Sequence, residues 1–328
     1  MCGMKHFELI AVALMCVLLW SCHSGDFTIE GEIKGLGTQN VRITYLADDG
    51  VATEVVTAEQ GRFAFTGSSN RLTVVDIADA QGSSIIRAAA INGDRLTING
   101  ELEHPELIAV EGSEVNELWT QFRTEHSKLY ARAAGSERDQ AIEQWVGEHR
   151  QQATSALLLL FDHSAPLSPT AQQLLTAIAP EVRPDHLLAA VEALANYLSR
   201  GAASTMRTLT LCGTSGDFET LHADGHPMAI YCWSMADADR VAAFEACKHL
   251  AERGVVVADV LLDADTTGWA AKRQAASQLC HYWSPTGPMD ESLKPLRIAS
   301  VPWFIVADST GNICYRGSSP QEALKALP

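Results

Sequence analysis

One stretch of this sequence constrains the fold more than any other: residues 255–262 form a nearly continuous apolar run that is rich in valine. A run of this length and composition is typical of a strand buried on both faces, as in a parallel sheet. A second apolar run lies at 228–233, and the residues between, 237–253, carry apolar side chains at helical spacing. Together they predict a β-α-β unit with parallel strands.

The elements that follow extend this unit to the end of the chain, so we predict an α/β domain over residues 205–328. They are a helix at 266–277, a strand at 303–307, a strand at 312–315 and a helix at 320–327. The turn sequence Asp308-Ser309-Thr310-Gly311 joins the last two strands. The predicted order is β-α-β-α-β-β-α, with a parallel half and an antiparallel half.

Residues 113–204 have a different character, because Ala, Leu, Glu, Gln and Arg dominate and glycine becomes rare. Apolar side chains recur at helical spacing around Trp119, Trp145 and Val191. The pair Ser168-Pro169 is a second signal, because a serine followed by proline is typical of a helix start with proline in the first turn. We predict a helical region of about four helices.

Residues 22–112 show the pattern of a β domain. Val41, Ile43 and Tyr45 alternate with polar residues, and Phe63 and Phe65 alternate in the same way. Turn sequences such as Asp-Asp-Gly and Asn-Gly separate these short apolar runs. The spacing predicts a small antiparallel sandwich or barrel, and no catalytic constellation occurs in it.

The first 21 residues are predicted to be a lipoprotein signal peptide. An apolar run at 9–20 is too short to span a bilayer as a helix but suits a signal-peptide core. It leads into Leu-Leu-Trp-Ser-Cys, which resembles a bacterial lipobox ending at Cys22. Acylation of Cys22 would tether the mature chain to a membrane by lipid alone. An ordinary secretory signal with an incidental cysteine is the alternative.

The numbers of cysteines and of charged residues limit which classes of function are compatible with the chain. Eight cysteines are present, and those beyond residue 22 are Cys212, Cys232, Cys247, Cys280 and Cys314. An odd number cannot pair fully within one chain, so their pairing stays open, and no C-x-x-C spacing occurs. The chain has 24 Lys and Arg against 40 Asp and Glu, for a net charge of −16. Such a chain repels phosphate backbones, which argues against a nucleic-acid partner.

Several segments resemble a known family. Gly216-Asp217-Phe218-Glu219-Thr220-Leu221 with Asp224-Gly225, and Val301-Pro302 followed by Asp308 and Gly311, are similar to motifs of the TlpA/ResA-like branch of the thioredoxin superfamily. Its members are envelope thiol-disulfide oxidoreductases, often lipid-anchored. Residues 61–67 and 112–116 resemble the β domain of unknown function that often precedes such domains. The resemblance implies a thioredoxin-like fold for residues 205–328.

The chain departs from this family where the redox chemistry belongs. The family has a C-x-x-C motif after the first core strand, and here Asp237 and Arg240 occupy those positions. In the neighbouring register they are Ala236 and Asp239. Ser234-x-x-Asp237 instead fits a capping pattern, which predicts an ordinary helix start without a thiolate. We therefore expect no catalytic residue. If a thiol does take part in catalysis, Cys232 is the weak candidate.

Other candidate sites are few. In the family the matching proline is cis, and the residue before it offers backbone groups to an extended substrate, so the resemblance implies that Val301, Pro302 and Trp303 form a peptide-binding segment, by strand addition. The alternative is that the proline only shapes the turn and that Trp303 is a core residue. His222 and His226 have metal-like spacing but flank a turn, so no metal site is predicted. No nucleotide or dinucleotide motif occurs, and no cofactor is expected.

These observations predict a lipid-anchored cell-envelope protein, facing the periplasm or the cell surface. Its degenerate thioredoxin-like domain would bind or scaffold an extended peptide or envelope protein without dithiol turnover, while Cys22 engages membrane lipid. One alternative is a thiol-disulfide oxidoreductase that uses a non-standard cysteine such as Cys232. The other is an envelope interaction lipoprotein that works through its β domain.

Overall fold

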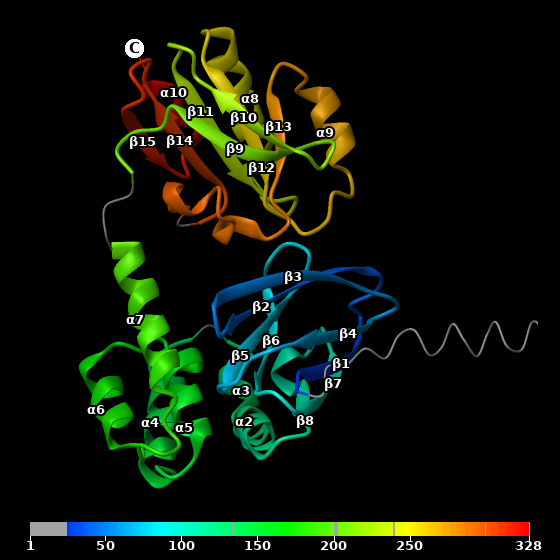
Figure 1. The fold of residues 1–328 in the computed structure, drawn as a ribbon, viewed down its shortest axis with the longest axis vertical. Helices are drawn as coiled ribbons and strands as arrows, with labels where there is room; N and C mark the ends of the chain where they lie inside the picture. The colour runs from blue at the N-terminus through cyan, green and yellow to red at the C-terminus, as the bar shows by residue number, and fades with distance from the viewer. Residues whose placement is uncertain (1–24, 133, 200–202, 239, 299, 328) are drawn as a thin grey trace, which may run out of the picture.

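The computed structural model describes residues 25–132, 134–199, 203–238, 240–298 and 300–327. The predicted signal peptide and Cys22 lie outside these ranges. Within them, no helix is both long enough and apolar enough to cross a membrane. Three parts follow one another along the chain: a β part, a helical part and a C-terminal region (Figure 1).

The β part consists of two four-stranded sheets. Their strands are β1 (Phe27–Lys34), β2 (Gln39–Ala47), β3 (Gly50–Ala58), β4 (Arg62–Gly67), β5 (Thr73–Ala78), β6 (Ser84–Ala90), β7 (Arg95–Glu101) and β8 (Ala109–Glu111). The sheet orders are β4-β1-β7-β8 and β3-β2-β5-β6. Alternate side chains from both sheets share one apolar core, in which the Phe27 and Tyr45 rings lie 5.5 Å apart. The prediction of purely antiparallel pairing is wrong, because β1 and β7 are parallel.

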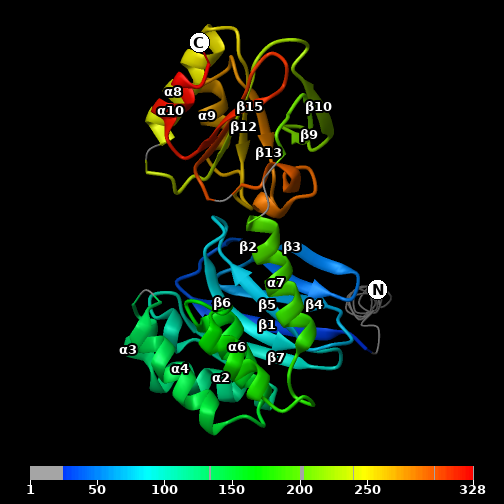
Figure 2. The same cartoon turned by 90° about the vertical axis from the view of Figure 1, so that its left-hand side faces the viewer.

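The helical part covers one side of the β part (Figure 2). Its elements are η1 (Pro105–Leu107), α2 (Glu114–Glu125), α3 (Ser127–Tyr130), α4 (Ser136–Glu148), α5 (Ala153–Leu157), the π-helical turn η2 (Leu158–Asp162), α6 (Pro169–Ala177) and α7 (Asp185–Ser199). Ser113 and Ser168 cap α2 and α6 through their side chains, and Pro169 stands in the first turn of α6. The buried Asn116 amide bonds both the N–H and the carbonyl of Ala89, which fixes α2 to β6.

The C-terminal region is one seven-stranded mixed sheet with helices. Its elements are β9 (Thr208–Gly213), β10 (Phe218–His222), β11 (Met228–Trp233), α8 (Arg240–Glu252), β12 (Val256–Leu261), α9 (Trp269–Ala275), β13 (Cys280–Trp283), η3 (Gly287–Met289), η4 (Lys294–Leu296), β14 (Trp303–Ala307), β15 (Ile313–Gly317) and α10 (Pro320–Lys325). The strand order is β10-β9-β13-β12-β11-β14-β15. The three helices share one core with one face of this sheet.

Three features of this region differ from the sequence-based expectation. The β9–β10 hairpin precedes the predicted unit, and β13 is an additional strand parallel to β12. Cys280 therefore lies in a strand and not near the end of a helix. Helix α8 begins at Arg240, three residues later than predicted. Figure 1 shows the C-terminal region above the β part, with α7 rising beside the β part from the helical part towards the C-terminal region.

Candidate functional site

The corner after β11 is formed by residues 234–238, Arg240 and Asp263. The Ser234 N–H donates to Asp237 Oδ2 at 2.9 Å, and the Asp237 N–H donates back to the Ser234 carbonyl at 3.1 Å. Arg240 Nη1 donates to the carbonyls of Met235 and Asp237 at 2.7 and 2.8 Å. Arg240 thus donates to two carbonyls of the turn that precedes α8. The contacts of the predicted Ser-x-x-Asp capping pattern form, since Ser234 Oγ also accepts the Ala236 N–H at 3.1 Å, but residues 235–238 are not helical and α8 itself begins at Arg240.

Two carboxylates stand at this corner. Asp263 is 1% exposed, and its Oδ2 accepts the Met235 N–H at 2.8 Å. Burial raises the pKa of both Asp237 and Asp263 above the usual carboxyl range. The Ser234 N–H opposes the shift at Asp237, and hydrogen bonds from the Ser234 side chain and the Met235 N–H oppose it at Asp263. Asp263 Oδ1 is buried and has no hydrogen-bond partner among the described residues. The corner thus presents two carboxyl groups that accept hydrogen bonds from the local backbone.

An arginine from the β part reaches this end of the sheet. Arg42 on β2 is 8% exposed and donates to the carbonyls of Pro285, at 2.9 Å, and Leu262. Burial lowers the pKa of the Arg42 guanidinium, while the charges of Asp263 and Asp79 oppose the shift. The fit is tight at Gly287, which has a φ of 76° and whose added Cβ would lie 2.7 Å from Arg42 Nη1.

Two further hydrogen bonds close this contact between the β part and the C-terminal region. Asn40 Nδ2 donates to the Ala264 carbonyl at 3.0 Å, and the Ala264 N–H donates to the Ala80 carbonyl at 2.7 Å. We call this set, centred on Arg42, the joint. It lies directly beside the corner, because Leu262 and Ala264 flank Asp263 in the chain. The corner is therefore covered, on this side, by the chain's own β part.

The predicted peptide-binding segment lies at the start of β14. The Val301-Pro302 peptide bond is cis, and Val301 is 36% exposed. Trp303 is partly buried, pairs with Cys232 across the sheet and packs against the core on that face. Asp237, Arg240 and Ala236 lie in the corner after β11, whereas Asp239 lies outside the described residues. The structure thus brings the corner and the Val301 segment to neighbouring strands, β11 and β14.

The strand pattern identifies the architecture. Strands β12 and β11 are parallel, whereas the pairs β11–β14 and β14–β15 are antiparallel, with α8 and α10 on one face. The C-terminal region has a thioredoxin-like fold. We refer to it below as the thioredoxin-like region.

Chains similar to this one are found among solved structures only. No family model and no curated protein matches the sequence. Among solved structures, the thioredoxin domain of a thiol-disulfide oxidoreductase from Bacteroides vulgatus is 15% identical over 39% of this chain and 95% of its own, with a TM-score of 0.33. A thiol-disulfide oxidoreductase from Bacteroides fragilis is 20% identical over 37% and 97%, with a TM-score of 0.31.

A third solved structure spans more of the chain. A thioredoxin-like protein from Bacteroides caccae is 13% identical and covers 57% of this chain and 75% of its own, with a TM-score of 0.33. At identities and TM-scores this low, the likeness assigns no activity to this chain. The chemistry has to be judged from the chain's own side chains.

The cysteines of the thioredoxin-like region are five free thiols. Cys232 on β11 and Cys247 on α8 are fully buried, and burial raises the pKa of both thiols far above its usual value. Cys212, Cys280 and Cys314 are less buried, but burial raises the pKa of each of these as well. A thiol with a raised pKa remains protonated at neutral pH, and the protonated thiol is a poor nucleophile.

A buried polar triad behind β11 was not predicted from the sequence. Asp259 on β12 is 1% exposed, accepts the Trp233 indole N–H at 3.0 Å and bonds His281 Nδ1 on β13. Asp259 and His281 are direct partners in the parallel ladder. The signal was present in the sequence as a lone Asp in an apolar run, but its partner depended on the unpredicted strand β13. The triad fixes Trp233 from behind the corner.

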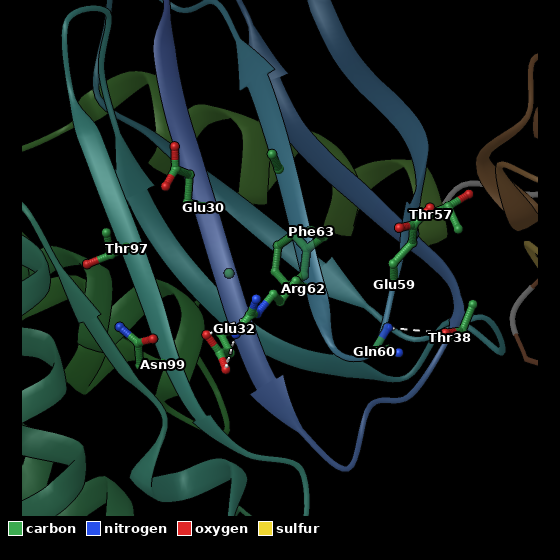
Figure 3. A pocket seen from close by; sticks show the side chains of 12 residues that line it. Glu30, Glu32, Thr38, Thr57, Glu59, Gln60, Arg62, Phe63, Thr97 and Asn99 are labelled. Carbon is green, nitrogen blue, oxygen red and sulfur yellow. Dashed lines mark hydrogen bonds and ion pairs between the residues drawn. The ribbon is translucent and has the colours of Figure 1, made fainter.

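A hollow that is open to solvent lies on the β part (Figure 3). Its volume is about 880 Å³, and Glu30, Glu32 and Arg62 line it from β1 and β4. Arg62 pairs with Glu32 at 3.3 Å, and the hollow is open to solvent. Among the described residues, no group of three His, Cys, Asp or Glu is placed to hold a metal, and His222 and His226 belong to no such group.

Proposed function

We propose that this chain is a lipid-anchored cell-envelope protein whose thioredoxin-like region binds or scaffolds a partner without dithiol turnover. The corner after β11 carries the proposal. A carboxylate, Asp237, and a guanidinium, Arg240, stand at the positions where the family resemblance places redox cysteines. Both side chains bond the local backbone, and neither can form or break a disulfide.

The remaining thiols support the same proposal. Dithiol exchange needs a thiolate at a partly exposed, electropositive place, with a second thiol within bonding distance. Cys232 and Cys247 are buried and protonated, and the carboxylate of Asp259 raises the pKa of each further. The most exposed thiol, Cys314, lies on β15 and donates to the Val306 carbonyl at 3.3 Å. None of these environments favours a thiolate.

The binding role rests on the segment from Val301 to Trp303. Val301 offers exposed apolar surface immediately before β14, at the edge of the corner. An extended peptide laid beside this segment would meet backbone groups and an apolar side chain, which is how strand addition achieves recognition. The occupant we propose is an extended peptide or a segment of an envelope protein.

Insulin reduction by dithiothreitol, followed as turbidity, tests the absence of turnover. The assay compares the mature chain, its Cys232→Ser variant and a dithiol thioredoxin as the positive control. We expect the mature chain and C232S to give the rate of dithiothreitol alone. A rate above that background that disappears in C232S contradicts the proposal and establishes the oxidoreductase alternative. A rate that C232S retains also contradicts it, by implicating another thiol.

Metabolic labelling with palmitate tests the lipid anchor. The full chain should incorporate label and fractionate with membranes, because acylation would place hydrocarbon chains on Cys22. The Cys22→Ser variant should incorporate none and should be released from the membrane fraction. Equal labelling of the two chains, or labelling of neither, contradicts anchoring at Cys22 without affecting the insulin result.

A further inference from the structure

A cavity of about 290 Å³ lies between the helical part and the β part, away from the thioredoxin-like corner. Its polar lining includes Arg87 on β6, Arg123 on α2, Tyr130 on α3, Arg138 on α4 and Asp162 on η2. We call it the arginine cavity. Three guanidinium groups in one cavity are unexpected in a chain whose net charge is −16. The state of each charged group decides what the cavity can hold.

The carboxylate of Asp162 already accepts hydrogen bonds from within the chain. Its Oδ2 accepts the Trp119 indole N–H and the Tyr130 hydroxyl, each at 2.7 Å. Burial, with the adjacent Asp162 charge, raises the pKa of the Tyr130 phenol, so the hydroxyl remains a donor. Arg87 also has partners within the chain, since it pairs with Asp76 at 3.0 Å and donates to the Phe161 carbonyl at 3.0 Å.

Arg123 and Arg138 are not satisfied in this way. Arg123 is 7% exposed, and its one hydrogen bond to a described residue is a long one of 3.4 Å to the Ile108 carbonyl. Its Nε is buried and has no hydrogen-bond partner among the described residues. Burial lowers the pKa of the Arg123 guanidinium, with the Asp162 charge opposing the shift. Desolvated donors of this kind are costly unless an acceptor is supplied.

Arg138 shows the same deficiency from the opposite helix. Its guanidinium carbon lies 5.0 Å from the centre of the Tyr130 ring, so the ring holds the group in place. Its Nε is also buried without a partner among the described residues. No ion pair joins Arg138 to a carboxylate in the described part of the chain. Two planar donor groups, contributed by α2 and α4, therefore line the cavity with unused N–H groups.

We propose that the arginine cavity binds a small organic carboxylate between Arg123 and Arg138. A carboxylate has the planar pair of oxygens that guanidinium donors match. A doubly charged phosphate fits less well, because the carboxylates of Asp162 and Glu106 also line the cavity and repel a second negative charge. Ile85 and Phe161 supply apolar wall for the organic part. This inference is independent of the proposed function of the thioredoxin-like region.

Calorimetric titration of the full chain tests the site, with acetate, succinate and benzoate as probes. Benzamide serves as the uncharged isostere of benzoate, and inorganic phosphate as the non-carboxylate anion. We expect saturable one-to-one binding of at least one carboxylate, with benzamide and phosphate each roughly tenfold weaker or absent, because charge-assisted hydrogen bonds supply the affinity. Absence of binding by all three carboxylates overturns the proposal, as does equal binding of benzoate and benzamide or tighter binding of phosphate.

Two variants locate the binding. Arg138→Gln removes the charge at the cavity, and we expect carboxylate affinity to fall roughly tenfold or more. Arg132→Gln is the matched control, because Arg132 is exposed and pairs with Glu137 outside the cavity. It should bind as the wild type does. Arg138→Lys keeps the charge but loses the planar donors, so it should bind with intermediate affinity. Wild-type affinity in Arg138→Gln, with native circular dichroism, overturns the site.

Discussion

Arginines and carboxylates meet in two buried regions of this molecule, the joint and the arginine cavity. At the joint, Arg42 donates to the carbonyls of Pro285 and Leu262, which the chain itself supplies. In the arginine cavity, the Nε atoms of Arg123 and Arg138 are buried without a partner among the described residues. The two regions differ in whether the donor groups of the buried arginine find hydrogen-bond acceptors in the chain, and not in whether the arginine is buried. A buried arginine that the chain satisfies holds two parts together, whereas one that it leaves unsatisfied favours an external acceptor.

The largest expected effect is at the joint. Arg42→Met keeps the length of the side chain but removes the guanidinium, so two carbonyls lose their donor and Asp263 loses its nearby cation. We expect a loss of about 3 kcal/mol in the free energy of unfolding, because removing one partner of a buried charged contact leaves the other uncompensated. Urea titration of the full chain measures this loss. Hydrogen exchange at the Ala264 N–H, which donates to Ala80, should accelerate in the same variant.

Arg62→Met is the control for this experiment. Arg62 is exposed and pairs with Glu32 on the surface, so its removal should change the unfolding free energy by less than about 0.5 kcal/mol. If R42M is as stable as R62M, and its Ala264 amide exchanges as in the wild type, the joint does not hold the two parts together.

The joint also shows where sequence reasoning ends. The β-α-β unit could be predicted because each strand is a continuous apolar run and the helix has its own spacing. The hydrogen bonds of Arg42 join residues 220 and 243 positions apart, and no local pattern indicates such a contact. The same holds for the arginine cavity, whose lining comes from β6, η1, α2, α3, α4 and η2. Its arginines look like ordinary charged residues of helices and a strand.

Local errors have local causes. Strand β13 has only four residues, Cys-His-Tyr-Trp, and its polar His281 is satisfied by Asp259 on the next strand. A short run with a polar member gives little periodic signal. Helix α8 begins at Arg240 and not at 237, after a turn in which the Met235 and Asp237 carbonyls accept hydrogen bonds from the Arg240 side chain. At the corner, Asp263 accepts the Met235 N–H from 28 positions further along the chain, and no local pattern indicates that contact.

An intermediate effect tests how tightly the joint is packed. Gly287→Ala would place a Cβ 2.7 Å from Arg42 Nη1, and the guanidinium cannot withdraw without breaking its hydrogen bonds. Gly254→Ala is the matched control, since Gly254 has a φ of 81° and open space around its Cβ position. Both variants carry the cost of a positive φ. We expect G287A to lose about 1 to 2 kcal/mol more than G254A, owing to overpacking.

The double variant R42M/G287A isolates that clash. With the guanidinium absent, the added methyl group meets a flexible apolar side chain, so the two losses should sum to more than the loss in the double variant. Urea titration of the four chains in the cycle gives the coupling free energy. Strictly additive losses would mean that Gly287 is required for its backbone conformation alone and that the joint has room to spare.

The smallest effect is the one that separates the two regions most clearly. Arg138→Gln, measured without added carboxylate, removes donors that the chain leaves unsatisfied and a ring contact with Tyr130. The lost cation–π contact costs about 0.5 to 1 kcal/mol, and relief of the desolvated guanidinium offsets part of it. The unfolding free energy should therefore change by less than about 1 kcal/mol, far below the loss in R42M. With saturating benzoate, the wild type should gain stability through ligand binding and Arg138→Gln should gain much less. If Arg138→Gln instead loses as much as R42M in the absence of ligand, Arg138 is a structural group like Arg42, and the distinction between a satisfied joint and an unsatisfied cavity fails.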